Sequence, residues 1–254
     1  MNKYQALLDR NKRNEILRLV HISLKNRYVY FAVPKCANST VKYHLQLLEY
    51  TGSPYSVDAD HIHDQSRTPL ISPYQLPDDI LEDVLSSDAY TRFIVVRHPV
   101  TRLLSCYLDR IQKAKNSTAR KLVSGWLGVG VGSAISFDQF VRVICEHEDG
   151  ELEQHFKLQS DIVAYPHIPI THVIHFERME QELPELLKKL GAKRNTELDQ
   201  NLSPSKTSAA DRLAQYYTPE LLDMIHDRYK PDLDAFGYTK LTLDKTPRLT
   251  EQEA

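Results

Sequence analysis

A lysine in a short segment ahead of three helix-starting residues carries the clearest chemistry in this sequence. Lys35 lies in Pro34-Lys35-Cys36-Ala37, which follows a predicted strand and leads into Asn38-Ser39-Thr40. Asn, Ser and Thr are preferred at helix N-termini, where unpaired backbone N–H groups and the helix dipole favour an anion. The apolar spacing of Val41, Leu45 and Leu48 continues the helix. The segment therefore predicts a phosphate-binding loop, Pro34 to Thr40, with Lys35 as its cation.

The loop lacks the glycines of the nucleotide-binding pattern G-x-x-x-x-G-K-[ST]. A kinase on a P-loop scaffold is an alternative that Ser39 or Thr40 suits, but no Asp is assigned to Mg²⁺. A phosphatase built on Cys36 is weaker, because the residue six positions on is Lys42 and not arginine. Cys36 is interpreted as a small loop filler, and a lysine that extends into water is the simpler alternative for Lys35.

Arg97 and Ser105 form a second pair of residues with phosphate-binding chemistry. Arg97 follows the predicted strand Arg92–Val96, and Ser105 lies eight residues later in a helix whose first turn contains Pro99. A guanidinium and a hydroxyl together suit a phosphate dianion. Taken alone, the pair is better explained by a solvated helical serine, on a polar face with Arg102 and Asp109, and by a surface ion pair of Arg97.

The elements that must position these residues alternate between strands and helices. Bulky runs predict strands at Tyr28–Val33, Arg92–Val96 and His172–Phe176, each followed by a helical pattern. This order predicts an α/β fold with a central parallel sheet flanked by helices, with ligands at the carboxyl ends of the strands. Further helices are predicted over Met179–Leu190, ending at Gly191, and over about Pro219–Tyr229. Long functional loops are predicted at Gly52–Pro77 and at the glycine-rich segment Gly125–Gly132, which contains Trp126.

Composition limits the classes of partner. The chain has 254 residues and a net charge of -2, which gives no broad electrostatic case for nucleic acid. Its three cysteines lack C-x-x-C spacing, so we expect neither a disulfide framework nor a zinc site. A reducing compartment, the cytoplasm, is therefore expected. No segment has the apolar length of a signal peptide or a transmembrane helix.

We expect a single domain over residues 1–254 with a core at 28–238, a peripheral N-terminal helix at 1–20 and a peripheral tail at 241–254. Oligomeric state is not predicted.

Together, the two phosphate-binding segments resemble the sulfotransferases that use 3′-phosphoadenosine 5′-phosphosulfate (PAPS). The segment Val33–Thr40 is similar to the 5′-phosphosulfate loop of that family, and Phe93–Tyr107 to its 3′-phosphate motif, V-R-x-P-x-x-R-L-x-S-x-Y. Further segments resemble the Golgi-type carbohydrate sulfotransferases (sulfotransferase family 2-like): Phe137–Val141, His155–Gln159, His175–Met179, Asn201–Ser203 and Tyr229–Tyr238. The resemblance covers most of Tyr28 to Tyr238.

The resemblance implies a P-loop NTPase-like sulfotransferase fold and transfer of a sulfuryl group from PAPS to a hydroxyl, most often on a carbohydrate. The loop Pro34, Lys35, Cys36, Ala37, Asn38, Ser39 and Thr40 would bind the 5′-phosphosulfate, and Arg97 and Ser105 the 3′-phosphate. Lys35 would stabilise the leaving 3′-phosphoadenosine 5′-phosphate (PAP), and no metal is required. The partner is a hydroxyl-bearing acceptor, a glycan or glycoconjugate, and not a nucleic acid.

A general base must accept the proton of the acceptor hydroxyl. Asp60-His61-Ile62-His63-Asp64 lies where related glycan sulfotransferases carry a catalytic histidine, so His61 and His63 are both candidates. A metal site and plain solvated histidines are the alternatives for this pair. His155 is a weaker candidate, and its alternative role is to orient a neighbouring loop.

The sequence departs from the family pattern in two places. Cys36-Ala37-Asn38 replaces smaller or glycine-containing variants, and Val41 stands where tryptophan is common. The chain also shows neither the membrane anchor nor the luminal cysteines of the Golgi-type relatives, so a soluble, bacterial-style enzyme is expected, with peripheral membrane contact left open. A non-catalytic nucleotide-binding module on the same fold remains the alternative from a different class.

Overall fold

The computed structural model describes residues 2–192 and 208–243 and divides the chain into two compact units. The first contains Met1–Val96 and Asp161–Pro204, and the second Arg97–Ser160 and Ser205–Ala254. The single domain over residues 1–254 stays a prediction. Asn201-Leu202-Ser203 and residues 244–254 of the expected tail lie outside the described residues.

A four-stranded sheet forms the centre of the first unit, in the order β1-β2-β3-β4. Its strands are β1 (Val20–Ser23), β2 (Tyr28–Phe31), β3 (Thr91–Val96) and β4 (His172–His175). β2, β3 and β4 are parallel, with Tyr28 opposite Thr91 and Phe93 opposite His172. The predicted α/β fold and its three strands are confirmed. The antiparallel edge strand β1 was not predicted, because it follows a helix with no glycine or proline between them.

Burial explains why these short runs form strands. Every residue of β2 is buried, and the ring of Tyr30 stacks on that of Phe93 with centroids 5.0 Å apart. A parallel sheet covered on both faces needs this continuous run of bulky residues. Arg92, at the start of β3, is buried too, and its guanidinium donates to the carbonyl oxygens of Pro169 and Ser87.

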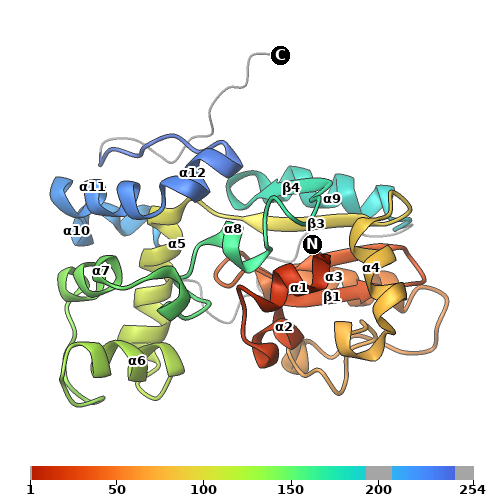
Figure 1. Ribbon diagram of the computed structural model, residues 1–254, viewed down its shortest axis with the longest axis horizontal. Coiled ribbons are helices and arrows are strands. Elements are labelled where there is room, and N and C mark those ends of the chain that lie inside the picture. Colours follow the sequence, from red (N-terminus) through yellow and green to blue (C-terminus); the bar gives the residue numbers. More distant parts are fainter. Residues whose placement is uncertain (1, 193–207, 244–254) are drawn as a thin grey trace. The chain divides into compact units, whose positions relative to one another are not determined.

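The described helices of the first unit are α1 (Lys3–Leu8), α2 (Arg13–Leu19), α3 (Asn38–Glu49), α4 (Asp78–Ser86) and α9 (Met179–Lys189) (Figure 1). The single N-terminal helix expected over 1–20 is thus two short helices. Leu7 and Ile16 on them are fully buried, so this segment belongs to the core rather than the periphery. α9 ends as predicted, with Gly191 at a left-handed φ of 98°.

The second unit is helical. It contains α5 (Pro99–Cys106), a π-helical segment (Tyr107–Lys113), α6 (Thr118–Trp126), α7 (Phe137–Glu146), α10 (Leu213–Tyr216), α11 (Pro219–Arg228) and α12 (Lys230–Phe236); Gln159 and Ser160 begin the short helix α8 (Gln159–Ile162). Its core is strongly aromatic, and Tyr107, Phe137, Phe140 and Tyr217 meet with ring centroids 4.7–6.3 Å apart. The predicted helix at Pro219 is confirmed.

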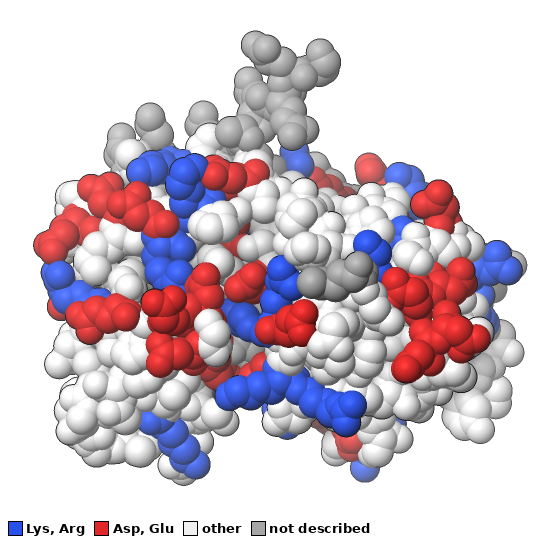
Figure 2. All heavy atoms as spheres, viewed as in Figure 1, with Lys and Arg blue, Asp and Glu red and all other residues white. Residues whose placement is uncertain are grey.

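The two predicted loops are only partly irregular. Gly52–Pro77 contains single 3₁₀ turns at Ala59–His61 and Pro73–Gln75. The glycine-rich segment begins within α6, and Trp126 at the end of that helix stacks on His147 with ring centroids 3.9 Å apart. Within residues 2–192 and 208–243, no helix is both long and apolar enough to cross a membrane. Basic and acidic side chains both occur across the face in Figure 2, in keeping with the near-zero net charge.

Candidate active site

The turn between β2 and α3 places the predicted phosphate-binding loop at the carboxyl end of a buried parallel strand. The prediction that Asn38, Ser39 or Thr40 caps α3 is wrong: the N-cap is Ala37, and no side chain caps the helix. The Asn38 and Ser39 side chains are engaged elsewhere. Tyr30 Oη donates to Asn38 Oδ1 at 2.7 Å, and Ser39 Oγ lies 2.9 Å from His63 Nε2. Backbone N–H groups at such a helix start suit an anion.

Two residues of the loop have left-handed backbone conformations that glycine normally provides. Lys35 has a φ of 69° and Ala37 a φ of 57°. For residues with a Cβ this conformation costs roughly 1–2 kcal/mol each, so the surrounding structure must hold it. Turns of this kind can form anion-binding concavities lined by backbone N–H groups. The loop therefore adopts a glycine-type turn without glycine.

The remaining loop residues anchor the turn. Pro34 and Cys36 are buried, and the Cys36 thiol lies 3.7 Å from the carbonyl oxygen of Pro34. Lys35 between them is partly exposed. The burial of Cys36 agrees with its interpretation as a small loop filler. Because Lys35 is partly exposed, its charge does not carry the full cost of burial.

The structure separates the two candidate histidines. His63 is exposed and reaches Ser39 at the start of α3 through its Nε2 atom. His61 instead pairs its Nδ1 atom with Asp58 Oδ2 at 2.9 Å, and its side chain is 49% exposed. Arg67 also binds Asp58. Only His63 is therefore brought to the predicted phosphate-binding loop.

In the second unit, Thr101 and Ser105 lie four residues apart on one face of α5, and Arg97 precedes the N-cap of that helix. Arg97 Nε donates to Thr101 Oγ1 at 3.1 Å, which holds the arginine side chain against the first turn of α5. Arg97 is only 7% exposed and Ser105 only 3%. The alternative of a solvated serine and a surface arginine is thus wrong.

Two fully buried residues, Gln159 and Asp232, hold the backbone of Arg97. The N–H of Arg97 donates to Gln159 Oε1 at 3.0 Å, and Gln159 Nε2 donates to the carbonyl oxygen of Arg97 at 2.9 Å. Asp232 accepts from the backbone N–H groups of Gln159 and Ser160, and from the Ser160 hydroxyl. Burial raises the pKa of Asp232, although these hydrogen bonds oppose the shift. Gln159 and Asp232 are therefore positioning residues for Arg97.

Arg102 extends this packing. Predicted to lie on a solvated polar face with Ser105 and Asp109, it is instead 1% exposed, and Asp109 is also buried. Its guanidinium donates to the carbonyl oxygens of Lys157 and Gln154 at 2.7 and 3.0 Å. The polar face of α5 thus fixes the segment that leads into Gln159.

His155, the weaker base candidate, pairs with a carboxylate of the same unit. Its Nδ1 atom lies 2.8 Å from Glu153 Oε1. Burial alone would raise the pKa of Glu153, but its hydrogen bond and ion pair with His155 lower it. His155 is committed to a local contact that orders its own loop. Within residues 2–192 and 208–243, no group of three or more His, Cys, Asp or Glu side chains is arranged to hold a metal ion.

The sheet flanked by helices, with a lysine-containing turn at the end of β2 and a buried arginine directly after β3, agrees with the α/β fold that the resemblance implies. Residues 20–239 match the Sulfotransferase family, and the chain belongs to that family. The resemblance found in the sequence is confirmed. The bacterial-style character stays a prediction.

Several curated carbohydrate sulfotransferases are similar to the chain at low identity. Carbohydrate sulfotransferase 14 from Danio rerio is 23% identical over 239 residues, covering 89% of this chain and 64% of the relative. Carbohydrate sulfotransferase 9 from Homo sapiens is 21% identical, covering 87% of this chain and 53% of the relative. Carbohydrate sulfotransferase 11 from Rattus norvegicus is 21% identical, covering 89% of this chain and 68% of the relative. The chain thus spans between about half and two thirds of these relatives' length. No solved structure matches it significantly.

The residues that the sequence did not single out act through long-range contacts. Gln159 and Asp232 are 73 positions apart, so no local pattern joins them. The burial of Lys42 on α3 could have been predicted from the sequence, because Lys42 lies beside the apolar stripe of Val41, Leu45 and Leu48.

We expect Ala37→Gly to stabilise the chain by about 1 kcal/mol, because glycine adopts the left-handed backbone without a Cβ penalty. The melting temperature should rise by about 2–4 °C. The matched control is Ala214→Gly on α10, where glycine should destabilise the helix. If both variants lose the same stability in thermal unfolding, the loop does not store this strain.

We expect Gln159→Ala to weaken binding of PAP by roughly 10- to 30-fold, since the Arg97 backbone loses two hydrogen bonds, each worth about 1 kcal/mol. Gln159→Glu, which keeps the acceptor, should retain part of the affinity. Gln215→Ala, at an exposed position of the same unit, is the control. Calorimetric titration measures the PAP affinity of all three variants. An unchanged affinity in Gln159→Ala would show that its two hydrogen bonds to the Arg97 backbone do not position Arg97.

Proposed function

We propose that the chain transfers a sulfuryl group from PAPS to a hydroxyl of a carbohydrate. The observation that carries this proposal is the match to the Sulfotransferase family across residues 20–239, which includes both predicted phosphate-binding segments. The similar relatives are named as carbohydrate sulfotransferases, which supports a glycan or glycoconjugate as acceptor.

In this proposal two segments of the chain bind the phosphates of the donor. The turn Pro34–Thr40 binds the 5′-phosphosulfate through Lys35 and the backbone N–H groups at the start of α3. Its left-handed residues and its uncapped helix start support that role. Arg97 and Ser105 bind the 3′-phosphate. The burial of both side chains, and the bond from Arg97 to Thr101 on α5, support that role.

The transfer is an in-line displacement at sulfur. The acceptor oxygen forms a bond to sulfur while the bond between sulfur and the bridging phosphate oxygen breaks, and PAP leaves. Lys35 stabilises the negative charge that develops on that oxygen, and a preorganised cation is worth most in a site shielded from water. The acceptor proton passes to a histidine.

We assign the role of general base to His63 rather than His61. His63 contacts Ser39 at the start of α3, whereas His61 is paired with Asp58. A histidine pKa near neutrality suits a group that must accept a proton at physiological pH. A cytoplasmic location is part of the proposal, and Cys36, Cys106 and Cys145, which form no disulfide, are compatible with it.

A transfer assay on the intact chain tests the proposal. PAPS is supplied with a panel of sugars, lipids and small alcohols, and sulfated products are detected by mass spectrometry. We expect sulfated sugars that depend on PAPS and are absent when PAP replaces it. Binding of PAPS without any sulfated product across the panel would favour the non-catalytic module.

We expect Lys35→Ala to lower turnover by roughly 10²–10³-fold while PAP affinity falls much less. Arg97→Ala should mainly weaken PAP, by about 1.5–3 kcal/mol, because it removes a charged hydrogen-bonding partner. Lys188→Ala, an exposed lysine on α9, is the control. Equal losses of turnover and affinity in Lys35→Ala would contradict its catalytic role, and an unchanged PAP affinity in Arg97→Ala would contradict the 3′-phosphate assignment.

A further inference from the structure

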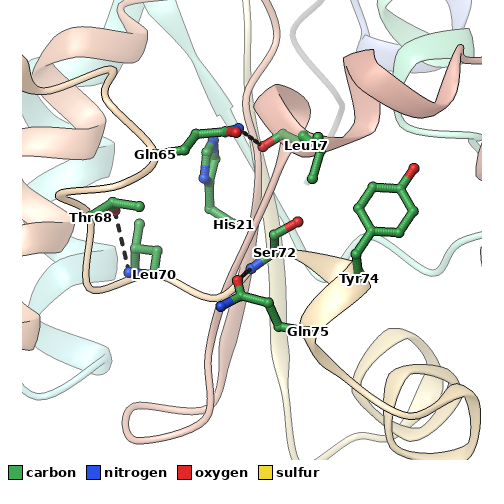
Figure 3. Close-up of a pocket in the computed structure, with 8 residues that line it drawn as sticks. All are labelled: Leu17, His21, Gln65, Thr68, Leu70, Ser72, Tyr74 and Gln75. Carbon is green, nitrogen blue, oxygen red and sulfur yellow. Dashed lines mark hydrogen bonds between the residues drawn. The ribbon is translucent and has the colours of Figure 1, made fainter.

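The buried histidines of this chain differ in how far along the sequence their contacts reach. His21 lines a cavity of about 240 Å³ in the first unit (Figure 3), and its Nε2 atom lies 3.0 Å from the carbonyl oxygen of Arg18. That contact spans three residues, whereas His98 Nε2 in the second unit lies 2.9 Å from the carbonyl oxygen of Thr239, 141 residues later. His98 directly follows Arg97 and occupies the open position of the pattern V-R-x-P. The side chain next to Arg97 thus binds a distant segment of the chain.

The hydrogen bonds of His98 fix the position of its ring proton. A carbonyl oxygen can only accept, so Nε2 carries the proton that is donated to Thr239. The N–H of Val100 donates to Nδ1 at 3.3 Å, so Nδ1 carries no proton, and this bond makes His98 the side-chain cap of α5. His98 is fully buried. Only the neutral ring with its proton on Nε2 satisfies both contacts.

His98 also acts on the Arg97 guanidinium, through Thr101. The Thr101 hydroxyl donates to the carbonyl oxygen of His98 at 3.0 Å. Because a hydroxyl has a single proton, its oxygen is then the acceptor for Arg97 Nε, 3.1 Å away. Thr101 is only 1% exposed, so water has little access to these bonds. The orientation of the arginine therefore depends on the first turn of α5, which the His98 side chain caps.

The segment 238–241 is held by two histidines that have opposite hydrogen-bonding roles. His98 donates to the carbonyl oxygen of Thr239, whereas the N–H of Leu241 donates to Nε2 of His226 on α11 at 3.0 Å. Nε2 of His226 therefore carries no proton, and this ring is neutral too. The rings of His98 and His226 face each other edge to face with centroids 6.5 Å apart. The segment is thus bound to the N-terminus of α5 and to α11 within one unit.

We propose that His98 is a positioning residue for Arg97, and that the docked segment 238–241 holds its ring in the orientation this role needs. The proposal rests on the proposed function, because it takes Arg97 as a ligand of the 3′-phosphate. Docking of the segment and binding of PAP then strengthen each other, since coupling between two equilibria is reciprocal. PAP should hold the segment in place, and an undocked segment should weaken PAP.

Acid should undock the segment, because a proton on Nε2 of His226 removes the acceptor of its bond. Burial lowers the pKa of His226 to about 4, and the charges of His98 and Lys240 add to that shift. The carboxylates of Asp223 and Asp227 oppose it, and Lys240 Nζ lies 3.6 Å from Asp227. A histidine whose pKa is lowered by docking favours the docked form above its ordinary pKa of about 6.5. That preference is lost as the pH falls from 6.5 toward the lowered pKa.

The test follows exchange of the Leu241 amide proton in the intact chain by NMR, corrected for the intrinsic exchange rate at each pH. This N–H is buried and bound to His226 while the segment is docked. In the natural chain we expect its protection to fall roughly tenfold per pH unit between pH 6.5 and 5. Saturation with PAP should raise the protection. His226→Gln keeps an acceptor that does not titrate, so its protection should not depend on pH.

Variants at α5 separate the two steps of the coupling. His98→Asn keeps a cap acceptor but loses the donor to Thr239, so it should lower Leu241 protection and weaken PAP by roughly fivefold, the effect of one lost hydrogen bond. Thr101→Val removes the hydroxyl between the two residues, so it should weaken PAP similarly and leave Leu241 protection without nucleotide unchanged. Calorimetric titration gives the affinities. His167→Asn, at an exposed position of the first unit, is the control.

Three results would overturn the proposal. The first is a Leu241 protection that PAP does not raise in the natural chain, and the second is an unchanged PAP affinity in His98→Asn. The third is a protection that stays constant with pH in the natural chain, because His226 would then not hold the segment. Failure of the proposed function is a different result, in which the natural chain itself binds no PAP while its protection still depends on pH.

Discussion

The left-handed turn at Lys35 and Ala37 is the constraint on which the first unit's chemistry depends. It reverses the chain between a fully buried strand and α3 while leaving the helix without a side-chain cap. Because Ala37 takes the cap position, the side chains of Asn38 and Ser39 are available for Tyr30 and His63. The same turn sets the register of α3 and so directs Lys42 into the interior.

In the second unit, hydrogen bonds to Gln159 and Thr101 keep Arg97 ordered directly after β3. Gln159 binds both backbone groups of Arg97, and Thr101 binds its side chain. Asp232 in turn orders Gln159. Ordering a long side chain in advance reduces the entropy lost when it binds a ligand. A fixed guanidinium also suits the planar recognition of phosphate better than a mobile one.

The sequence predicted the elements that depend on local patterns. β2, β3 and β4 are short runs of bulky residues with clear ends, and α9 and α11 carry their own capping signals. It failed where tertiary contacts outweigh local preference. Asn38 and Ser39 favour cap positions but bind distant side chains, and the polar face of α5 is buried by a segment some fifty residues away. The phosphate-binding segments were recognisable as residue types, whereas the groups that position them were not.

Calorimetric titration of the intact chain with PAP and, separately, with ATP tests the central claim most directly. The two nucleotides differ in the 3′-phosphate and in the length of the 5′-phosphate chain, which are the features that separate a sulfotransferase donor site from a kinase site. We predict that PAP binds at least tenfold more tightly and that added Mg²⁺ does not change the order. Tighter binding of ATP would contradict the assignment of both phosphate-binding segments.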